Sequence, residues 1–478
     1  MATHTTQYRA ELYIDGGWHP AAETIPVTDL SEDEVLTEIS AASTEDAERA
    51  LGAAVAAKSE MQELSVVQRA DWMNAIAAEI ESHAEVLAET IVREAGKPIS
   101  SARGEVESAA ERFRRAAQEA RSLSGEYLEG TTDGHEGWQA VVRKEPVGVV
   151  LCITPYNYPL STTALQVAPA LAAGNAVVLK PASKTPLSAA LLTEFVVDTA
   201  PDLPAGGMAF VPGRASAIGD VLVGDDRVDA IAMTGSSPAG KHIAETSGMV
   251  QLHMELGGNA PLVVFPDADL EAVAEAAASG SLKYAGQRCS AVSRLLVHRS
   301  VHDEVIEQMA DRMDAFVAGD LFDPETKLGP LISVDQADWV QELVDDAVER
   351  GATLVTGGHR DGRFYAPALL ADVPHDARIV HEEQFGPVVV VSSVADEAEA
   401  IALANEGDLG LDAAVFTSDY DRAMRVADRL QAGAVRINGA PSHGIGDIPF
   451  GGVGDSGIGR EGIGKTIEAF LTSKTIVL

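Results

Sequence analysis

From residue 147 onward the sequence alternates short apolar runs with helix-like stretches, and this alternation restricts the possible folds more than any other feature. The apolar runs are bounded by Gly or Pro, which is typical of buried strands that end in turns. Strands that alternate with helices are typical of βαβ units around a parallel sheet. The first unit contains the apolar runs Val147–Ile153, Ala176–Leu179, Met208–Val211 and Ala230–Met233, and the helical stretches Leu160–Ala173, Pro186–Ala200, Ala215–Val223 and Pro238–Thr246. The pattern restarts at Pro261–Val264 and continues to about Val435, so we predict two α/β units in series.

Before these units, residues 43–126 have the residue spacing of helices. Ser43 and Asp46 form a capping-box pattern at the start of the first helix. A second periodic run covers Val66 to Arg93 and is followed by the stop signal Gly96–Pro98. A third run covers Ser101 to about Leu123. We therefore expect a helical segment ahead of the first sheet.

The net charge excludes some classes of partner. The chain of 478 residues has 35 Lys and Arg against 73 Asp and Glu, a formal charge of −38, and 46% of its residues are hydrophobic. A folded protein with this charge repels nucleic acid and anionic lipid, so neither is an expected partner. The polar start and the lack of a long apolar stretch predict neither a signal peptide nor a membrane span. Two cysteines in so long a chain indicate a reducing compartment, so we expect a cytoplasmic protein.

The C-terminal region contains glycine patterns that resemble nucleotide-binding loops. Gly452–Gly457 and Gly457–Gly462 match G-x-G-x-x-G, and Gly459–Thr466 matches G-x-x-x-x-G-K-T. Such loops need an apolar strand before them and a nucleotide-binding sheet around them, and only 12 residues follow Thr466. A nucleoside triphosphatase is therefore a disfavoured alternative. The last residues, Thr475–Leu478, read as an apolar strand that needs a sheet to join, which another subunit could provide.

The two cysteines have different surroundings. Cys152 lies within an apolar strand, where a thiol is typically a small core residue. Cys289 lies between a helical stretch and the strand Ser293–Val297, directly after Arg288. A neighbouring cation or a helix terminus stabilises a thiolate, so Cys289 is a candidate nucleophile, and a structural cysteine is the alternative.

Two further polar residues are candidates for catalysis. Glu255 lies in the apolar segment Leu252–Leu256 before paired glycines, and a carboxyl in apolar surroundings has a raised pKa that suits a general base. A surface carboxylate at a strand end is the alternative. Asn157 lies between two prolines, where its amide N–H can donate to an oxyanion, and an ordinary turn residue is the alternative.

Together these segments resemble the aldehyde dehydrogenase superfamily over nearly the whole chain. Eight motifs occur in the family's order: Thr154–Leu160, Val178–Pro181, Met233–Ser236, Glu255–Gly258, Gly286–Cys289, Leu328–Leu331, Glu382–Pro387 and Pro449–Gly452. The resemblance also accounts for the glycine-rich segment, which is similar to the family's C-terminal signature. It implies NAD(P)-dependent oxidation of an aldehyde to a carboxylic acid.

The resemblance assigns a role to each catalytic candidate. Cys289 attacks the aldehyde, and the Asn157 amide with the Cys289 backbone N–H meets the oxyanion, a donor pair worth about 3–4 kcal/mol. Loss of hydride to the nicotinamide leaves a thioester, and Glu255 activates the water that hydrolyses it. Relatives that transfer the acyl group to coenzyme A lack this Glu, so hydrolysis is expected. A non-catalytic relative that kept the fold is the alternative, disfavoured by the presence of all three residues.

The resemblance also implies a cofactor site. Lys180 matches the residue that bonds the adenosine ribose, Ser236 opens the helix that receives the pyrophosphate, and Glu383 matches the nicotinamide-ribose carboxylate. The remaining implied cofactor residues are Thr154, Pro155, Tyr156, Gly213, Gly235, Leu256, Gly257 and Phe385. NAD-specific members usually have Glu where this chain has Ser183, which is followed by Lys184. The enzyme is therefore expected to accept NADP as well as NAD. A preference for NADP over NAD is also compatible with Ser183. No metal is expected.

The substrate is less defined. Arg288, Tyr158 and the run Gln287–Val292 resemble the non-phosphorylating glyceraldehyde-3-phosphate dehydrogenases, but His443 stands where that group has a further Arg. Lactaldehyde and semialdehyde dehydrogenases are equally compatible. Arg288 can hold an anionic group of the substrate, or it can form a structural salt bridge.

The resemblance implies two Rossmann-like parallel-sheet domains and a β-arm for oligomerisation. Residues 1–125 and 147–256 are expected to form the dinucleotide-binding domain, and residues 257–464 the catalytic domain. Residues 126–146 and 465–478 are expected to form the arm. The expected partners are a small aldehyde and copies of the chain itself in a homodimer or homotetramer.

The acid excess predicts a salt-dependent fold, because salt screens the repulsion among carboxylates that remain hydrated. We expect the melting temperature to rise when KCl is increased from roughly 0.1 M to about 2 M, where screening is nearly complete. Thermal unfolding followed by circular dichroism measures this. Equal stability at both concentrations would contradict adaptation to a saline, halophilic cytoplasm.

Overall fold

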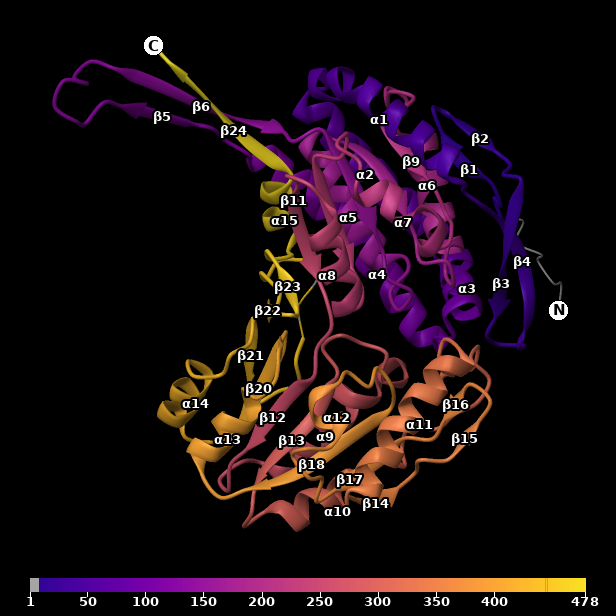
Figure 1. Ribbon diagram of the computed structural model, residues 1–478, viewed down its shortest axis with the longest axis vertical. Coiled ribbons are helices and arrows are strands. Elements are labelled where there is room, and N and C mark those ends of the chain that lie inside the picture. The colour runs from indigo at the N-terminus through magenta and orange to yellow at the C-terminus, as the bar shows by residue number, and fades with distance from the viewer. Residues whose placement is uncertain (1–7, 443, 445) are drawn as a thin grey trace.

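The computed structural model describes residues 8–442, 444 and 446–478 (Figure 1). Within these residues the chain forms two large sheets that are flanked by helices, and a smaller three-stranded sheet that projects from the body. The two α/β units in series that the sequence pattern predicts are confirmed. No helix in the described ranges combines the length and apolar character needed to cross a membrane.

The first large sheet is built mainly from the segment after residue 147. In spatial order its strands are β2 (Gly17–His19), β1 (Leu12–Ile14), β9 (Met208–Phe210), β8 (Ala176–Lys180), β7 (Val149–Ile153), β10 (Ala230–Thr234), β11 (Gln251–Glu255) and β23 (Gly457–Ile458). The strands from β9 to β11 are parallel, and those at the two edges are antiparallel. The carboxyl ends of β9, β8, β7, β10 and β11 therefore lie along one edge of the sheet. The last strand, β23, comes from the glycine-rich segment near the C-terminus.

Helices cover both faces of this sheet. They are α1 (Thr44–Glu63), α2 (Val66–Ser82), α3 (Ala84–Ala95), α4 (Ile99–Ser122), α5 (Ser161–Ala173), α6 (Leu187–Thr199), α7 (Ala215–Val223), α8 (Ser237–Thr246) and α15 (Ile463–Ala469). Helices α2, α4, α5 and α6 pack together, and α1 packs on α7. The predicted capping box of Ser43 and Asp46 is confirmed at α1.

The predicted helical run over Val66–Arg93 is two helices. The chain leaves the helical conformation at His83, with φ −109° and ψ 22°, and this residue ends α2 and precedes α3. The apolar spacing continues on both sides of His83 because both helices bury a face in the same core. Periodicity therefore gave no sign of the turn.

The second large sheet contains the strands after residue 257. In spatial order they are β14 (Thr353–Thr356), β17 (Ala368–Ala371), β18 (Val388–Val394), β13 (Val292–His298), β12 (Ala260–Val264), β20 (Asp412–Phe416) and β21 (Ala434–Ile437). All neighbours are parallel except β14 with β17. The helical segments of this unit are α9 (Leu270–Leu282), the 3₁₀ turn η1 (Lys283–Gly286), α10 (His302–Met313), α11 (Val334–Glu349), α12 (Arg378–His381), α13 (Glu397–Ala404) and α14 (Tyr420–Ala427).

Three short antiparallel pairs complete the body, and the sequence pattern indicated none of them. They are β3 (Glu23–Asp29) with β4 (Glu34–Ala41), β15 (Arg360–Asp361) with β16 (Phe364–Tyr365), and β19 (Leu409–Gly410) with β22 (Val453–Gly454). In the core of the first unit Cys152 is fully buried, in agreement with its predicted structural role.

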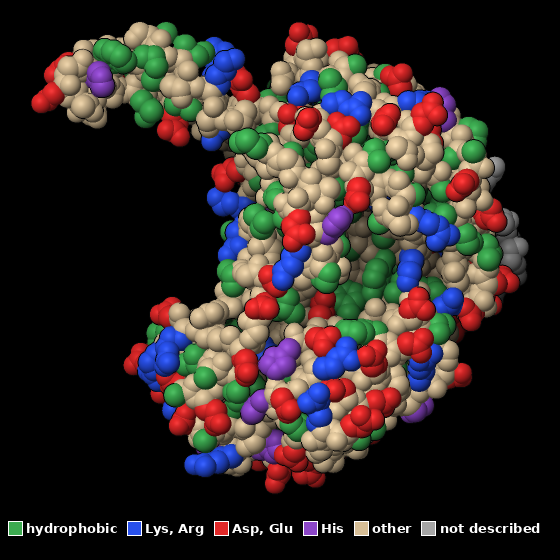
Figure 2. All heavy atoms as spheres, viewed as in Figure 1, with side chains coloured by type: hydrophobic (Ala, Val, Ile, Leu, Met, Phe, Trp, Pro, Cys, Tyr) green, Lys and Arg blue, Asp and Glu red, His purple; other side chains and the backbone are tan. Residues whose placement is uncertain are grey.

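The projecting sheet consists of β5 (Glu126–Glu129), β6 (Gln139–Pro146) and β24 (Leu471–Val477), in the order β24-β6-β5 (Figure 1). The terminal strand is longer than predicted and pairs with β6 of its own chain from Leu471 to Val477. It is an edge strand of this sheet, and its outer edge has no partner strand among the described residues. Figure 2 shows hydrophobic side chains on the surface of this projection. Tyr127 and Leu128 of β5 are about half exposed. That the projection joins subunits stays a prediction.

Candidate active site

Four segments that are far apart in the sequence line one cavity of about 440 Å³. Asn157 follows β7, Thr234 ends β10, and Glu255 ends β11. These strands are neighbours in one parallel sheet, so their carboxyl ends lie close together, where ligands typically bind in such sheets. Cys289 reaches the same cavity from the loop before β13 of the second sheet.

An unusual turn directs the Cys289 loop. Tyr284 and Ala285 have left-handed backbone conformations, with φ 55° and 51°, and Gly286 follows with φ 71°. Non-glycine residues rarely adopt this conformation, and they often do so at functional sites. A Cβ at Gly286 would lie 2.0 Å from the carbonyl oxygen of Gly386, so only glycine fits there. The turn reverses the chain between α9 and β13 and leaves Cys289 partly exposed on the cavity wall.

The surroundings of Cys289 raise the pKa of its thiol. Burial is the largest cause, and the carboxyls of Asp412, Glu255 and Glu383 act in the same direction. Arg288 lowers the pKa, but its effect is the smallest. In the protein without ligand, burial thus opposes the thiolate, and the effect of Arg288 is smaller than that of burial and the acids. That Cys289 is the nucleophile stays a prediction.

The paired glycines after Glu255 bring three functional segments together. A Cβ at Gly258 would lie 2.2 Å from the Cys289 carbonyl oxygen, and one at Gly257 would lie 2.6 Å from Oε2 of Glu383. The Gly258 N–H donates to Oε1 of Glu383 at 2.9 Å. Burial raises the pKa of Glu383 to about 7. The absence of side chains at both positions thus allows Glu255, Cys289 and Glu383 to share one site.

Glu255 is a buried carboxyl without internal partners. Its side chain is 2% exposed, and neither carboxyl oxygen accepts a hydrogen bond from any described residue. Burial and the nearby acids Glu461 and Asp412 raise its pKa well above the usual range of a glutamate. A surface role at the strand end is excluded, and such a carboxyl is suited to accept a proton near neutral pH.

Sequence reasoning missed three charged residues of this site. Glu461 has a pKa of about 7, raised by burial, and Asp412 has one of about 8 for the same reason. Arg112 of α4 is half-buried: its Nη1 donates to the Ser161 carbonyl, its buried Nε has no partner among the described residues, and burial lowers its pKa. The only sequence signal for Glu461 was an acidic residue within the glycine-rich segment. Arg112 and Asp412 have no local sequence signal, because α4 and β20 carry no motif around them.

Asn157 connects its loop directly to the Cys289 loop. It is 6% exposed, and its Nδ2 donates to the Gln287 carbonyl at 2.8 Å. The amide carries two N–H groups, so one remains for a ligand. Gln287 is fully buried and accepts from the Ile332 N–H at 2.8 Å, which fixes the far side of the loop.

The substrate candidates lie on the same cavity. Arg288 donates to the Gly280 carbonyl at 3.5 Å and to the Ser290 hydroxyl at 3.2 Å. Among the described residues no carboxylate lies within ion-pair distance of it, so the salt-bridge interpretation is not supported. Tyr158 lines the cavity, and His443 lies outside the described residues.

The predicted cofactor residues form a row along the carboxyl edge of the first sheet. They follow or end successive strands: Gly213 after β9, Lys180 at the end of β8, Thr154, Pro155 and Tyr156 after β7, Gly235 and Ser236 after β10, and Leu256 and Gly257 after β11. Ser236 is the N-cap residue of α8. Its hydroxyl makes no capping hydrogen bond to this helix, which leaves the helix N-terminus open to an anion.

Lys180 has the surroundings of a ligand-binding residue. It is 5% exposed, and among the described residues its ammonium group donates only to the Pro181 carbonyl, at 3.4 Å. Burial lowers its pKa to about 8. A buried ammonium group needs partners, and a ribose hydroxyl pair would supply them. These residues therefore fit a dinucleotide.

The two ends of the row have further contacts. At one end the Ser183 hydroxyl donates to the Gly213 carbonyl at 2.7 Å. At the other, the Tyr156 and Phe385 rings meet edge to face at 5.8 Å. Phe385 has a left-handed backbone with φ 45° directly after Gln384, and this turns it toward the cofactor edge.

Comparison with known proteins identifies the family. The model of the aldehyde dehydrogenase family matches residues 18–476. The chain belongs to this family. Among its relatives, NADP-dependent glyceraldehyde-3-phosphate dehydrogenase of Streptococcus equinus is 37% identical over 475 residues, 99% of each chain. 3-Sulfolactaldehyde dehydrogenase of Priestia aryabhattai is 35% identical over 477 residues, 100% of this chain and 99% of the relative.

Solved structures agree with this assignment. The NADP complex of NADP-dependent glyceraldehyde-3-phosphate dehydrogenase from Bacillus halodurans has a TM-score of 0.96 to this structure, with 37% identity and 99% coverage of both chains. This aldehyde dehydrogenase thus has the family's fold, and it oxidises aldehydes with NAD or NADP. The glycine patterns do not form a phosphate loop: β23 is a short antiparallel edge strand, and Lys465 forms an exposed ion pair with Glu468 at 2.9 Å.

Proposed function

We propose that this aldehyde dehydrogenase oxidises small aldehydes that carry an anionic group, and that it prefers NADP. The observation that carries the proposal is that three cations on the cavity beside Cys289, namely Arg112, Arg288 and Lys283, form no ion pair with a described residue. Aldehyde chemistry follows from the catalytic residues, and the substrate class follows from these cations.

The catalytic steps follow from the arrangement of three side chains. After the Cys289 thiol gives its proton to solvent water, its sulfur bonds to the aldehyde carbon, and the carbonyl oxygen becomes an oxyanion. The Asn157 amide and the Cys289 backbone N–H donate to that oxyanion. When bound, NAD or NADP supplies the hydride acceptor that leaves a thioester on Cys289. Glu255 then takes a proton from water, whose oxygen attacks the thioester carbon, and the carbon–sulfur bond breaks to release the acid.

The row of residues along the sheet edge would hold the cofactor. Lys180 would bond the adenosine ribose, the N-terminus of α8 at Ser236 would bind the pyrophosphate, and Glu383 would bond the nicotinamide ribose. Phe385 would lie against the nicotinamide. This order places the reacting end of the cofactor beside Cys289, because Glu383 contacts the same glycine pair as the Cys289 carbonyl.

The cavity is suited to an anionic substrate. Arg112 and Arg288 line it, the first with a buried unpaired Nε and the second without a carboxylate in the described ranges. Lys283 lines the same wall. A guanidinium with an unused N–H on a cavity wall favours binding of phosphate, sulfonate or carboxylate. The names of two relatives, which act on a phosphorylated and a sulfonated aldehyde, are consistent with this class.

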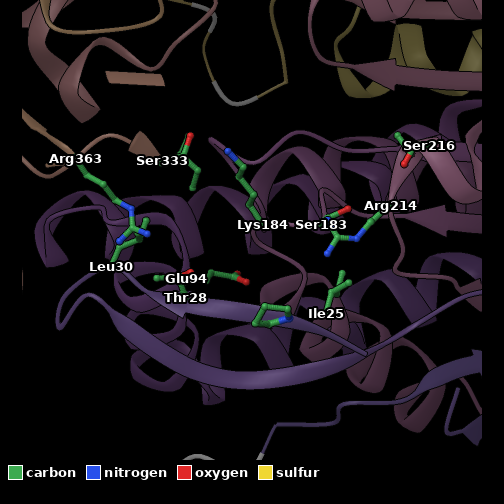
Figure 3. Close-up of a pocket in the computed structure, with 13 residues that line it drawn as sticks. Ile25, Thr28, Leu30, Glu94, Ser183, Lys184, Arg214, Ser216, Ser333 and Arg363 are labelled. Carbon is green, nitrogen blue, oxygen red and sulfur yellow. The ribbon is translucent and has the colours of Figure 1, made fainter. Parts of the chain in front are cut away.

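A second cavity, of about 490 Å³, supports the preference for NADP (Figure 3). Ser183, Lys184 and Arg214 line it, and Figure 3 shows Arg214 beside Ser183. In the part of the chain that the structure describes, neither Lys184 nor Arg214 forms an ion pair. Most other arginines of this acidic chain are paired with carboxylates. Two unpaired cations beside the ribose-binding segment would stabilise the 2′-phosphate of NADP.

The catalytic assignment predicts distinct defects. Cys289→Ser should abolish aldehyde oxidation, and Asn157→Ala should lower kcat about 100- to 1,000-fold because one oxyanion donor is lost. Glu255→Gln should give a first turnover of NADPH followed by a slow steady state, because the thioester is no longer hydrolysed. Absorbance at the NADPH band in stopped-flow experiments separates these cases. Cys152→Ala is the control, and undiminished NADPH formation by Cys289→Ser would refute the assignment.

The pH profile tests the same assignment for Glu255. A base must be unprotonated, so kcat should fall as the pH decreases through the raised pKa of Glu255. In the parent enzyme this acid limb should lie well above the pH range in which ordinary glutamates titrate. Glu255→Gln should lose it.

The substrate class predicts a selective loss of binding. Arg112→Leu and Arg288→Leu should each raise KM for D-glyceraldehyde 3-phosphate about 10- to 100-fold, the usual weight of a charged hydrogen bond. Their KM for unphosphorylated D-glyceraldehyde should change little. Arg103→Leu, on the exposed side of the same helix α4 and paired with Glu85, is the matched control. Equal efficiency of the parent enzyme with both aldehydes would overturn the anionic class.

The cofactor preference predicts a change confined to NADP. We expect kcat/KM of the parent enzyme to be higher with NADP than with NAD. Arg214→Ser with Lys184→Ser should lower it about 10- to 100-fold for NADP only, since NAD has no 2′-phosphate. Ser183→Glu should reverse the preference by repulsion. A strong preference of the parent enzyme for NAD would refute the proposal.

A further inference from the structure

A buried lysine lies between the two loops that carry Asn157 and Cys289. Lys97 follows α3, and its side chain is 1% exposed. Its Nζ lies 3.5 Å from the centroid of the Tyr158 ring and 4.5 Å from that of the Tyr284 ring. The two rings meet edge to face at 6.2 Å. Tyr158 belongs to the Asn157 loop and Tyr284 to the Cys289 loop, so one ammonium group contacts both.

Glu105 of α4 joins this lysine to the start of α5. One of its carboxyl oxygens accepts from Lys97 Nζ, and the other accepts from the backbone N–H groups of Leu160 and Ser161 at 3.0 and 3.1 Å. These N–H groups are at the N-terminus of α5, directly after the Asn157 loop. The carboxylate thus serves as a remote cap for the helix that anchors Asn157.

The Cys289 loop is attached to the same place. The Tyr284 hydroxyl donates to the Ala95 carbonyl at 2.6 Å, at the last residue of α3 and just before Lys97. Tyr284 is also the first of the left-handed residues that aim Cys289 at the cavity. A backbone in this conformation persists only when its surroundings hold it. The hydrogen bond to Ala95 and the contact with Lys97 provide that hold.

We propose that Lys97, paired with Glu105, is a positioning residue that fixes the distance between the Asn157 amide and the Cys289 sulfur. The proposal rests on the proposed roles of Asn157 and Cys289. The Asn157–Gln287 hydrogen bond already links the two loops, and Lys97 restrains their outer sides through the tyrosine rings. Cation–π contacts of this kind are strongest when the cation is desolvated.

Lys97 also lines the substrate cavity, so it must be distinguished from a ligand of the substrate's anionic group. Its ammonium is occupied by the Glu105 carboxylate and by the faces of two rings, and almost none of the side chain is exposed. Burial lowers its pKa to about 8, and repulsion from Lys283 and Arg288 acts in the same direction. Glu105 is the group that keeps a third cation stable beside them.

The test compares the parent enzyme with Lys97→Met and with the double variant Lys97→Met/Glu105→Gln, using NADP with D-glyceraldehyde 3-phosphate and with D-glyceraldehyde. We expect kcat to fall about 10- to 100-fold for both aldehydes, the usual effect of misplacing a catalytic group by about 1 Å. KM for both aldehydes and for NADP should stay within about three-fold of the parent values. Alkylation of Cys289 by iodoacetamide should also slow.

The double variant guards against misfolding, because it removes both buried charges while the Glu105→Gln side chain still offers a carbonyl oxygen to Leu160 and Ser161. Asp29→Asn is the matched control: it weakens the half-buried ion pair with Arg93 of α3 and should lower the melting temperature but not kcat. Parent-like kcat in a folded Lys97 variant would overturn the proposal. A rise in KM restricted to the phosphorylated aldehyde would overturn it too, by making Lys97 a substrate ligand. Failure of the catalytic assignment would be separate, since it would appear as activity in Cys289→Ser.

Discussion

The active site depends on the close approach of two backbones, that of Gly258 after β11 and that of Cys289 before β13. A Cβ at Gly258 would lie 2.2 Å from the Cys289 carbonyl oxygen, so any other residue would separate the two sheets. Because the backbones meet, Glu255 and Cys289 line one cavity, and Glu383 bonds to the Gly258 N–H. Cys289, the proposed base Glu255 and the proposed cofactor ligand Glu383 therefore meet because glycine lets the two backbones touch, and not because their charges attract.

Repulsion among the acidic groups opposes this assembly. Glu255, Glu461 and Asp412 are buried near one another, and the pKa of each is raised by loss of solvent. The acids Glu255 and Asp412 also raise the pKa of Cys289. Burial therefore favours the neutral form of these acids. The cations that line the two cavities without an ion pair to a described residue, among them Arg288 in one and Lys184 and Arg214 in the other, are the groups that an anionic ligand can meet.

Helices α3 and α4 contribute more than a cover for the sheet. Glu94 of α3 accepts from the N–H groups of Leu187 and Ser188 at the start of α6, at 2.7 and 2.9 Å. Glu105 of α4 does the same at the start of α5. Each carboxylate satisfies N-terminal groups that lack partners in their own helix. The loops before α5 and α6 carry Asn157 and Ser183, so both are held in place from outside the sheet.

Much of the fold and the expected chemistry can be read from the sequence. Local spacing indicates the alternating units, and the resemblance of motifs in order along the chain assigns roles to Cys289, Glu255 and Asn157. The break at His83, the pairing of β24 with its own chain and the raised pKa of the Cys289 thiol emerge only from the three-dimensional packing. This packing also decided the positions of Glu461, Asp412, Arg112 and Lys97. A pKa or a loop spacing depends on groups brought together from more than a hundred residues apart, and no local pattern contains that information.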